Sequence, residues 1–167
     1  KDNKNIIIQQ GMNLSDVSNL LKDSNLIKSK LAFKIWIKVN FVETKIKFGE
    51  YQFENKVSVN KIVSKLKNGD FFFRKLTIVE GTTKFDLFEK IRGIYPDQKI
   101  ELNELSDFLI ADTYYYNIAE NANELIKNIS KSSSKILNKL WTQRDEELLL
   151  KSIEEVFILS SIVEKET

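Results

Sequence analysis

The chain of 167 residues contains no histidine and no cysteine. The absence of histidine excludes a Ser-His-Asp triad and imidazole metal sites, and the absence of cysteine excludes thiolate chemistry and disulfide bonds. Only five glycines are present, and they form no glycine-rich phosphate loop, which argues against nucleotide binding. Catalysis must therefore use carboxylates, hydroxyls, lysines or tyrosines, and we expect neither a metal nor a cofactor.

A strong charge of one sign is also lacking, because the net charge is only +2, and we expect no nucleic-acid partner. Lysines between Lys22 and Lys47 alternate with apolar residues, which is typical of solvated helix faces; contact with an anionic surface is the alternative. No apolar run reaches the roughly 18 residues that a membrane-spanning helix needs. Residues 31–42 come nearest, and two lysines and an asparagine interrupt them.

The rest of the composition, with 42% hydrophobic and 30% charged residues, is that of a soluble globular protein. A chain of this length can bury a core as one domain or as two small ones. No internal repeat stands out. The composition shifts near residue 80 from strand-rich to helix-rich, which predicts an α+β protein with domains over residues 1–79 and 80–167.

In the first domain, segments 6–10 and 48–53 predict strands, and helices are expected after Asn13, Ser29 and Ser58. In the second of these helices, the apolar spacing predicts that one set of side chains faces the core. This set is Leu31, Ile35, Trp36 and Val39.

The first domain also contains a strand predicted over 71–79, with its three phenylalanines buried; an exposed interaction patch is the alternative. In the second domain, a helix with a capping box at Thr83 is predicted first. A short helix is expected over 101–110, and aromatic and β-branched residues favour a strand over 111–117. The last two helices are predicted to begin near Asn121 and Asp145.

The final helix carries two glutamates. Because successive helical residues turn by about 100°, Glu164 and Glu166 point roughly 200° apart and cannot both face one cleft. Glu164 shares its face with Ser161 and Phe157. Small polar and aromatic neighbours suit a partly desolvated carboxyl, the setting in which a glutamate acts as a general acid. Glu164 is a candidate catalytic acid/base and Ser161 a candidate substrate contact; an ordinary surface glutamate is the alternative.

Three consecutive tyrosines, at positions 114–116, form a second candidate feature. In a strand, Tyr114 and Tyr116 share one face and Tyr115 lies on the other. Aromatic rings often stack on sugars, so Tyr114 is a further candidate substrate contact, with core packing as the alternative.

Five segments match one known pattern in order and spacing. They are residues 47–53 (KFGEYQF), 66–69 (LKNG), 78–81 (IVEG), 105–114 (LSDFLIADTY) and 160–167 (SSIVEKET). The chain thereby resembles the endolytic murein transglycosylases, the YceG-like family also called MltG. The corresponding family motifs are K-x-G-x-Y-x-(F/L), L-x-x-G, (I/V)-x-E-G, L-E-G-x-x-x-P-D-T-Y and (A/S)SI(V/I)EKET. The last motif is the most specific, and the resemblance extends from about Ile6 to Thr167.

The chain departs from this pattern in one loop and in its extent. Ser106 and Asp107 stand where the family has Glu-Gly, and Ala111 replaces a proline, so the loop before the D-T-Y element differs. The N-R-L element and further cleft segments that follow E-K-E-T in the family do not follow here. We therefore expect an incomplete catalytic domain, little activity of the chain by itself, and a Glu164 more exposed than a working catalytic acid.

The resemblance implies cleavage of peptidoglycan between N-acetylmuramic acid and N-acetylglucosamine within glycan strands. It implies 1,6-anhydromuramyl ends as products, a role in cell-wall assembly and strand termination, and Glu164 as the catalyst, without metal or cofactor. It also implies a LysM-like N-terminal unit, glycan strands and cell-wall synthesis proteins as partners, and a single-pass anchor before Lys1. The anchor would lie in the bacterial inner membrane, with this region on the periplasmic side.

Two other interpretations stay open. The chain could be a LysM-like glycan-binding or partner-binding module without catalysis, or a structural α+β protein with no glycan function.

Overall fold

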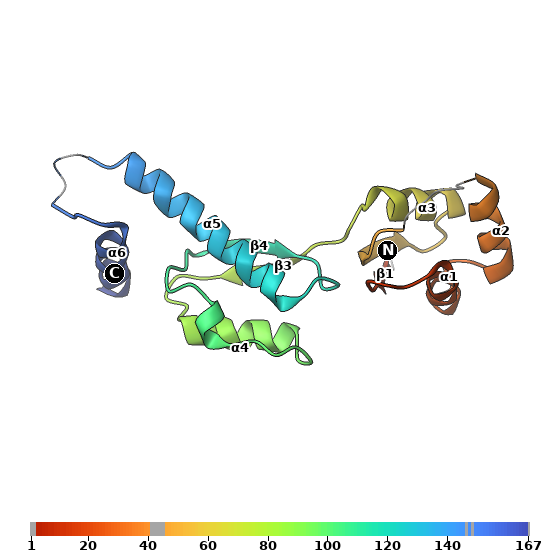
Figure 1. Ribbon diagram of the computed structural model, residues 1–167, viewed down its shortest axis with the longest axis horizontal. Coiled ribbons are helices and arrows are strands. Elements are labelled where there is room, and N and C mark those ends of the chain that lie inside the picture. Colours follow the sequence, from red (N-terminus) through yellow and green to blue (C-terminus); the bar gives the residue numbers. More distant parts are fainter. Residues whose placement is uncertain (1–2, 41–45, 146, 148, 167) are drawn as a thin grey trace. The chain divides into compact units, whose positions relative to one another are not determined.

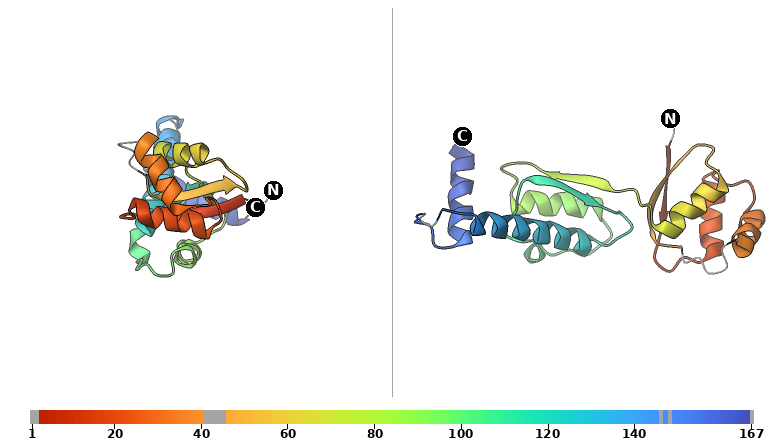
Figure 2. Two further views of the ribbon diagram at one scale, coloured as in Figure 1. Left: turned by 90° about the vertical axis from the view of Figure 1, so that its right-hand side faces the viewer. Right: turned by 90° about the horizontal axis from the view of Figure 1, so that it is seen from above.

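The computed structural model describes residues 3–40, 46–145, 147 and 149–166. Within these residues the predicted α+β fold is confirmed, with six α-helices, one 3-10 turn and two small two-stranded antiparallel sheets. The chain divides into two compact units (Figures 1 and 2). Unit 1 comprises Lys1–Arg74 and Asn117–Glu120, and unit 2 comprises Lys75–Tyr116 and Asn121–Thr167. The functional domains 1–79 and 80–167 stay a prediction, because compact units and functional domains need not coincide.

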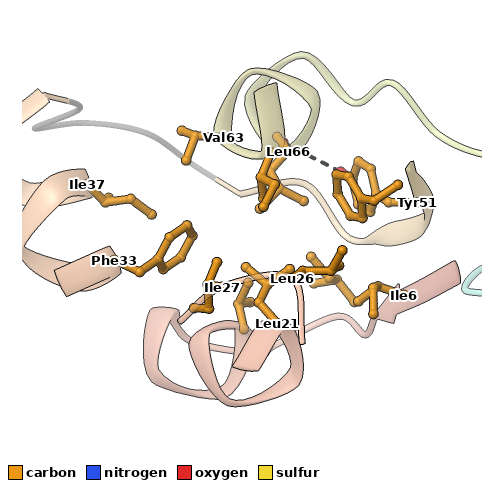
Figure 3. Packing of buried hydrophobic residues seen from close by; sticks show 13 residues of the cluster. Ile6, Leu21, Leu26, Ile27, Phe33, Ile37, Tyr51, Val63 and Leu66 are labelled. Atoms are coloured by element: carbon orange, nitrogen blue, oxygen red, sulfur yellow. Dashed lines mark hydrogen bonds between the residues drawn. The ribbon is translucent and has the colours of Figure 1, made fainter. Parts of the chain in front are cut away.

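Unit 1 packs helices against a pair of strands. Its described elements are β1 (Asn3–Ile8), α1 (Leu14–Asp23), α2 (Lys30–Asn40), β2 (Gly49–Glu54) and α3 (Val59–Asn68). β1 and β2 pair antiparallel, with Ile6 opposite Tyr51. Alternate strand residues point toward the helices, and all five elements contribute to one buried core (Figure 3).

Helices α1 and α3 begin at the predicted capping residues, and α3 ends at the predicted glycine. The Asn13 side chain accepts a hydrogen bond from the Asp16 N–H, while the Asp16 carboxylate accepts one from the Asn13 N–H, which forms a capping box before α1. Ser58 caps α3, and Gly69 ends it in the left-handed conformation, with φ +75°. Each such cap stabilises its helix by about 1 kcal/mol.

The predicted inner face of α2 is wrong. The structure buries Phe33 and Ile37, which are four residues apart, whereas Leu31, Ile35 and Val39 are 69%, 54% and 72% exposed. Trp36, the fourth residue of the predicted set, is partly buried against the core. The reason is that apolar residues occupy almost every side of this helix, so periodicity alone does not identify the face that packs.

The segment 47–53 is a packing motif of unit 1. Tyr51 and Phe53 point into the core, and the Tyr51 hydroxyl donates a hydrogen bond to the carbonyl of Lys47 at 2.8 Å. A Cβ atom at Gly49 would collide with the ring of Phe71, which packs on the Tyr51 ring at a centroid distance of 5.3 Å. The glycine and the tyrosine of the K-x-G-x-Y-x-F motif therefore serve close packing.

Burial of Tyr51 gives unit 1 a predictable sensitivity to alkali. Burial raises the pKa of its hydroxyl from 10.0 to about 12, and the charge of Asp70 adds to this shift. Because the folded pKa lies above the unfolded value, the stabilisation is complete below pH 10 and is lost as the pH rises toward about 12. We expect Tyr51→Phe to flatten the fall in unfolding free energy across this window, measured by urea denaturation followed by circular dichroism.

The exposed Tyr115 provides the matched control for this experiment. Tyr115→Phe should keep the wild-type pH dependence, and an unchanged slope in Tyr51→Phe would contradict the prediction.

The buried carboxylate of Glu50 links segments of unit 1 that lie far apart in the sequence. Glu50 has a side chain that is 0% exposed, and it accepts hydrogen bonds from the Arg74 guanidinium at 2.8 and 2.9 Å. The Asn5 amide donates a third at 2.8 Å. The Glu50 N–H donates to the side-chain oxygen of buried Asn117 at 2.9 Å. Residues far apart in sequence, on β1, β2 and the segment after residue 116, therefore complete one small core.

Unit 2 also combines a strand pair with helices, and the green helix and the long helix that follows it in sequence lie alongside the strands (Figure 2). Its described elements are β3 (Arg74–Ile78), α4 (Lys84–Ile94), η1 (Leu102–Glu104), β4 (Asp112–Tyr116), α5 (Ala122–Thr142) and α6 (Ile153–Glu166). The hydroxyls of Thr77 and Thr113 lie 3.1 Å apart, and the Lys75 ammonium lies over the Tyr115 ring. These two pairs advance in opposite directions along the strands, as in an antiparallel sheet.

Three predicted boundaries in this half are wrong. The strand expected over 71–79 begins at Arg74, because the Phe72 N–H instead donates to the Glu50 carbonyl, and Phe73 is half exposed. The helix expected over 101–110 is only the single turn of η1. The last helix begins at Ile153 rather than near Asp145, after Ser152 accepts a hydrogen bond from the Glu155 N–H.

Among the helices of the described residues, none has the length and apolar character to cross a membrane.

Candidate active site

Glu164 lies near the end of α6 and is exposed, as expected from the sequence. Its Oε1 atom accepts a hydrogen bond of 2.7 Å from the backbone N–H of Gly81. This bond joins two of the motif segments, residues 78–81 and the described part of 160–167, which lie far apart along the chain. The contact places the candidate acid against a turn of the β3–α4 connection.

This turn is fixed on both of its sides. Gly81 has φ +73°, and the Thr82 N–H donates to the Val79 carbonyl at 3.1 Å. Thr83 then caps α4, and the Asp86 carboxylate accepts hydrogen bonds from the hydroxyl and the N–H of Thr83. These bonds, the hydroxyl bond first, hold the pKa of Asp86 below its usual value. The strand before the turn and the capped helix after it therefore hold the Gly81 amide in one orientation.

Helix α6, which carries Glu164, packs on the rest of unit 2 through an aromatic contact. The rings of Phe157 and Phe108 meet edge to face at a centroid distance of 5.3 Å. Four other apolar side chains of α6 are about half exposed: Ile158, Leu159, Ile162 and Val163. By helical spacing these four side chains lie on the side of α6 away from Glu164, and that side is only partly covered by the described residues.

Ser161, the predicted neighbour of Glu164, is half-buried on the same helix. Its hydroxyl donates to the Ile158 carbonyl at 2.8 Å, and the Ser160 hydroxyl donates to the Phe157 carbonyl at 2.9 Å. Both side chains therefore bond to their own helix in this structure. A substrate contact of Ser161 stays a prediction.

Tyr114, the other predicted contact, lies in the core of unit 2 and is 6% exposed. Its hydroxyl donates to the Ile110 carbonyl at 2.9 Å and lies 3.3 Å from the Ser133 hydroxyl. Burial raises the pKa of this hydroxyl. The position agrees with the packing alternative, and a role of Tyr114 in substrate binding stays a prediction. The exposed ring of this run is Tyr115, under the Lys75 ammonium at 5.6 Å.

The arrangement offers a carboxyl group that accepts a hydrogen bond from the Gly81 peptide N–H. A single carboxyl can donate a proton to a leaving group and later accept one from a nucleophile. In the described part of the chain, no group of acidic side chains is placed to hold a metal ion. The roles of Glu164 and Ser161 stay predictions. The contact with Gly81 was not predicted, although residues 78–81 belong to a segment that matches a family motif.

Comparisons with known proteins identify the family of the chain. No curated protein sequence matches it. A crystal structure of a YceG-like protein, lmo1499, from Listeria monocytogenes aligns with 85% of this chain, at 20% identity and a TM-score of 0.46. The chain spans 57% of the length of that protein. The sequence model of the YceG-like family matches residues 6–167, which is nearly the whole chain. The chain therefore belongs to the YceG-like family.

Proposed function

We propose that the protein is an endolytic lytic transglycosylase of peptidoglycan, with Glu164 as its catalytic acid/base. Family membership over residues 6–167 supports the reaction class. The observation that carries the assignment of the residue is the hydrogen bond between the Glu164 carboxylate and Gly81, because it unites two family motif segments at one carboxyl group.

The proposed reaction needs one carboxyl group and no water. The Glu164 carboxylic acid donates its proton to the glycosidic oxygen between N-acetylmuramic acid and N-acetylglucosamine, and the bond from that oxygen to C1 breaks. The resulting carboxylate removes the proton from the muramoyl C6 hydroxyl, whose oxygen bonds to C1. The acid is regenerated, and the product is a 1,6-anhydro sugar. Two-carboxylate glycosidases differ, because their second group activates water or forms a covalent intermediate.

The full-length protein is proposed to cover the site further. A general acid works best when it is partly desolvated, whereas Glu164 and several apolar residues of α6 are exposed in this chain. Since the chain spans 57% of the length of lmo1499, we propose that the remaining part of the full-length protein packs on α6 and covers Glu164.

We further propose that unit 1 is LysM-like and binds glycan strands, while the second domain belongs to the catalytic part. The proposed location is the periplasmic side of the bacterial inner membrane, with an anchor before Lys1 and cell-wall synthesis proteins as partners. These proposals derive from the family resemblance, and unit 1 supports the first with its strand, two helices, strand and third helix.

Analysis of the products tests the proposed reaction. The full-length protein is incubated with purified peptidoglycan, the soluble products are separated by liquid chromatography, and their ends are identified by mass spectrometry. We expect long glycan fragments that carry 1,6-anhydromuramyl ends, because the proposed enzyme cleaves within the strands. Reducing ends would indicate a hydrolase instead, and glycan binding without any cleavage would favour the non-catalytic binding module.

A further inference from the structure

The two units have the same order of elements, which the sequence did not disclose. Unit 1 runs through β1, α1, β2 and α3, and unit 2 runs through β3, α4, β4 and α5. In each unit the two strands pair with one another, one helix follows each strand, and the connection before the second strand varies. Unit 1 has α2 in that connection, and unit 2 has η1.

The first half of the module repeats residue by residue. β1 ends at Ile8 and β3 at Ile78, and a glycine with positive φ follows at the same distance, Gly11 at +88° and Gly81 at +73°. A capping box then starts each helix, at the same spacing from the glycine. The equivalent pairs are Asn13 and Thr83 at the cap, Asp16 and Asp86 in the first turn, and the fully buried Val17 and Leu87.

The second half repeats with equal regularity. Tyr51 and Tyr114 are buried in β2 and β4, and each hydroxyl donates to the carbonyl four residues before it, at 2.8 and 2.9 Å. Ser58 and Asn121 cap the following helices at the same spacing from these tyrosines. The buried helix residues then correspond in order: Ile62 with Leu125, Val63 with Ile126, and Leu66 with Ile129.

Comparison of the two units distinguishes the structural role of the β–α turn from its contact with Glu164 at the candidate site. In both units the glycine turn ends a strand and begins a capped helix, so this role is structural. The units differ after their last shared helix, because α3 is followed by β3, whereas α5 is followed by α6. α6 brings Glu164 to the Gly81 amide. The carboxylate contact is therefore an addition made to the second copy of the turn.

The Gly81 N–H is well suited to orient a carboxyl group. A hydrogen bond from a peptide N–H to a carboxylate at 2.7 Å is short and charge-assisted. Glu164 is exposed, and a long exposed side chain samples several rotamers unless a contact selects one. Holding Oε1 fixes the position and the plane of the carboxyl group, which is the requirement for proton transfer to a bound glycosidic oxygen.

We propose that the turn between β3 and α4 of unit 2 positions the catalytic carboxyl group. In this turn, the Gly81 N–H is the group that holds Glu164 in place. This inference rests on the proposed function, since it concerns the geometry of the same proton transfer. It goes further by assigning a role to the E-G turn of unit 2 beyond the structural role that the equivalent turn has in unit 1.

The duplication supplies a matched pair of variants, Gly81→Ala and Gly11→Ala. At both positions the space around an added Cβ is open, and φ is similarly positive, so the backbone strain should be alike. Alanine retains the N–H, but its Cβ strains the left-handed backbone at this position, so the turn is expected to shift and to move the N–H away from Glu164. In the full-length protein we therefore expect Gly81→Ala to lower kcat by roughly ten- to a hundredfold, with KM changed less than about twofold. Gly11→Ala should leave kcat unchanged while it destabilises unit 1 to a similar degree.

A spectroscopic measurement keeps the inference testable if Gly81→Ala fails to fold. In the ¹H–¹⁵N spectrum of this chain, Glu164→Gln should shift the Gly81 amide resonance upfield and leave that of Gly11 in place. Equal kcat values for Gly81→Ala and Gly11→Ala, or an unmoved Gly81 resonance, would overturn the inference. The proposed function would survive either result if Glu164→Gln is inactive, and it would fall if that variant is active.

Discussion

The Glu164→Gln variant of the full-length protein is expected to release anhydromuramyl ends at least about a hundredfold more slowly than the wild type. General acid–base catalysis typically contributes roughly 10²- to 10⁴-fold, and in the proposed reaction one group performs both proton transfers. Glutamine keeps the size of the side chain and its carbonyl oxygen can still accept the Gly81 N–H, but it cannot donate the proton of a carboxylic acid. The rate is measured from the appearance of anhydromuramyl ends by mass spectrometry.

Glu166→Gln is the appropriate control for this variant. Glu166 lies on the same helix, is also exposed, and points roughly 200° away from Glu164. The same change of charge two residues away should therefore leave the rate unaltered. Equal rates for the Glu164 and Glu166 variants would remove Glu164 from the mechanism.

Arg74→Ala is expected to have the largest effect on stability, a loss of about 3 kcal/mol in the free energy of unfolding. The Glu50 carboxylate is completely buried and loses a bidentate partner at 2.8 and 2.9 Å, while the Asn5 amide stays. An uncompensated buried charge typically costs 3–5 kcal/mol. The Arg74 side chain is 41% exposed, so water can enter the space it leaves, and we expect the lower end of this range. Urea denaturation followed by circular dichroism measures the loss.

Two further variants identify the buried charge as the cause. Lys30→Ala breaks an exposed pair with Asp23, whose atoms lie 3.9 Å apart, and should cost less than about 1 kcal/mol. The double variant Glu50→Gln/Arg74→Ala should recover part of the loss, because no buried charge is then left without its partner. A loss in Arg74→Ala no greater than in Lys30→Ala would show that the ion pair contributes little.

Features fixed by neighbouring residues could be predicted from the sequence. The caps at Asn13, Ser58, Thr83 and Asn121 all occur where they were expected, because a cap depends on the side chain and on N–H groups two or three residues away. The inner face of α2 could not be predicted, since apolar residues lie on nearly all of its sides and the choice of Phe33 and Ile37 is made by the partner elements.

Only the local features of the candidate site could be predicted from the sequence. Glu164 stands within a specific motif, so it could be singled out without a structure. Its bond to Gly81 joins segments separated by most of unit 2, and no local pattern specifies such a contact. The structural repeat was not predicted because equivalent positions retain their physical class more often than their identity, as in Asn13 and Thr83 or Leu66 and Ile129.

The place of Asn117 in unit 1 has a consequence for how the protein is made. The chain leaves unit 1 after Arg74 and returns to it at Asn117, whose buried side chain accepts the N–H of Glu50. On the ribosome, the first unit therefore lacks the buried hydrogen bond of Asn117 until residue 120 has emerged, by which time β3, α4 and β4 have already been synthesised. A shortened gene that ends at Arg74 would encode the elements of unit 1 without the residue that completes its interior.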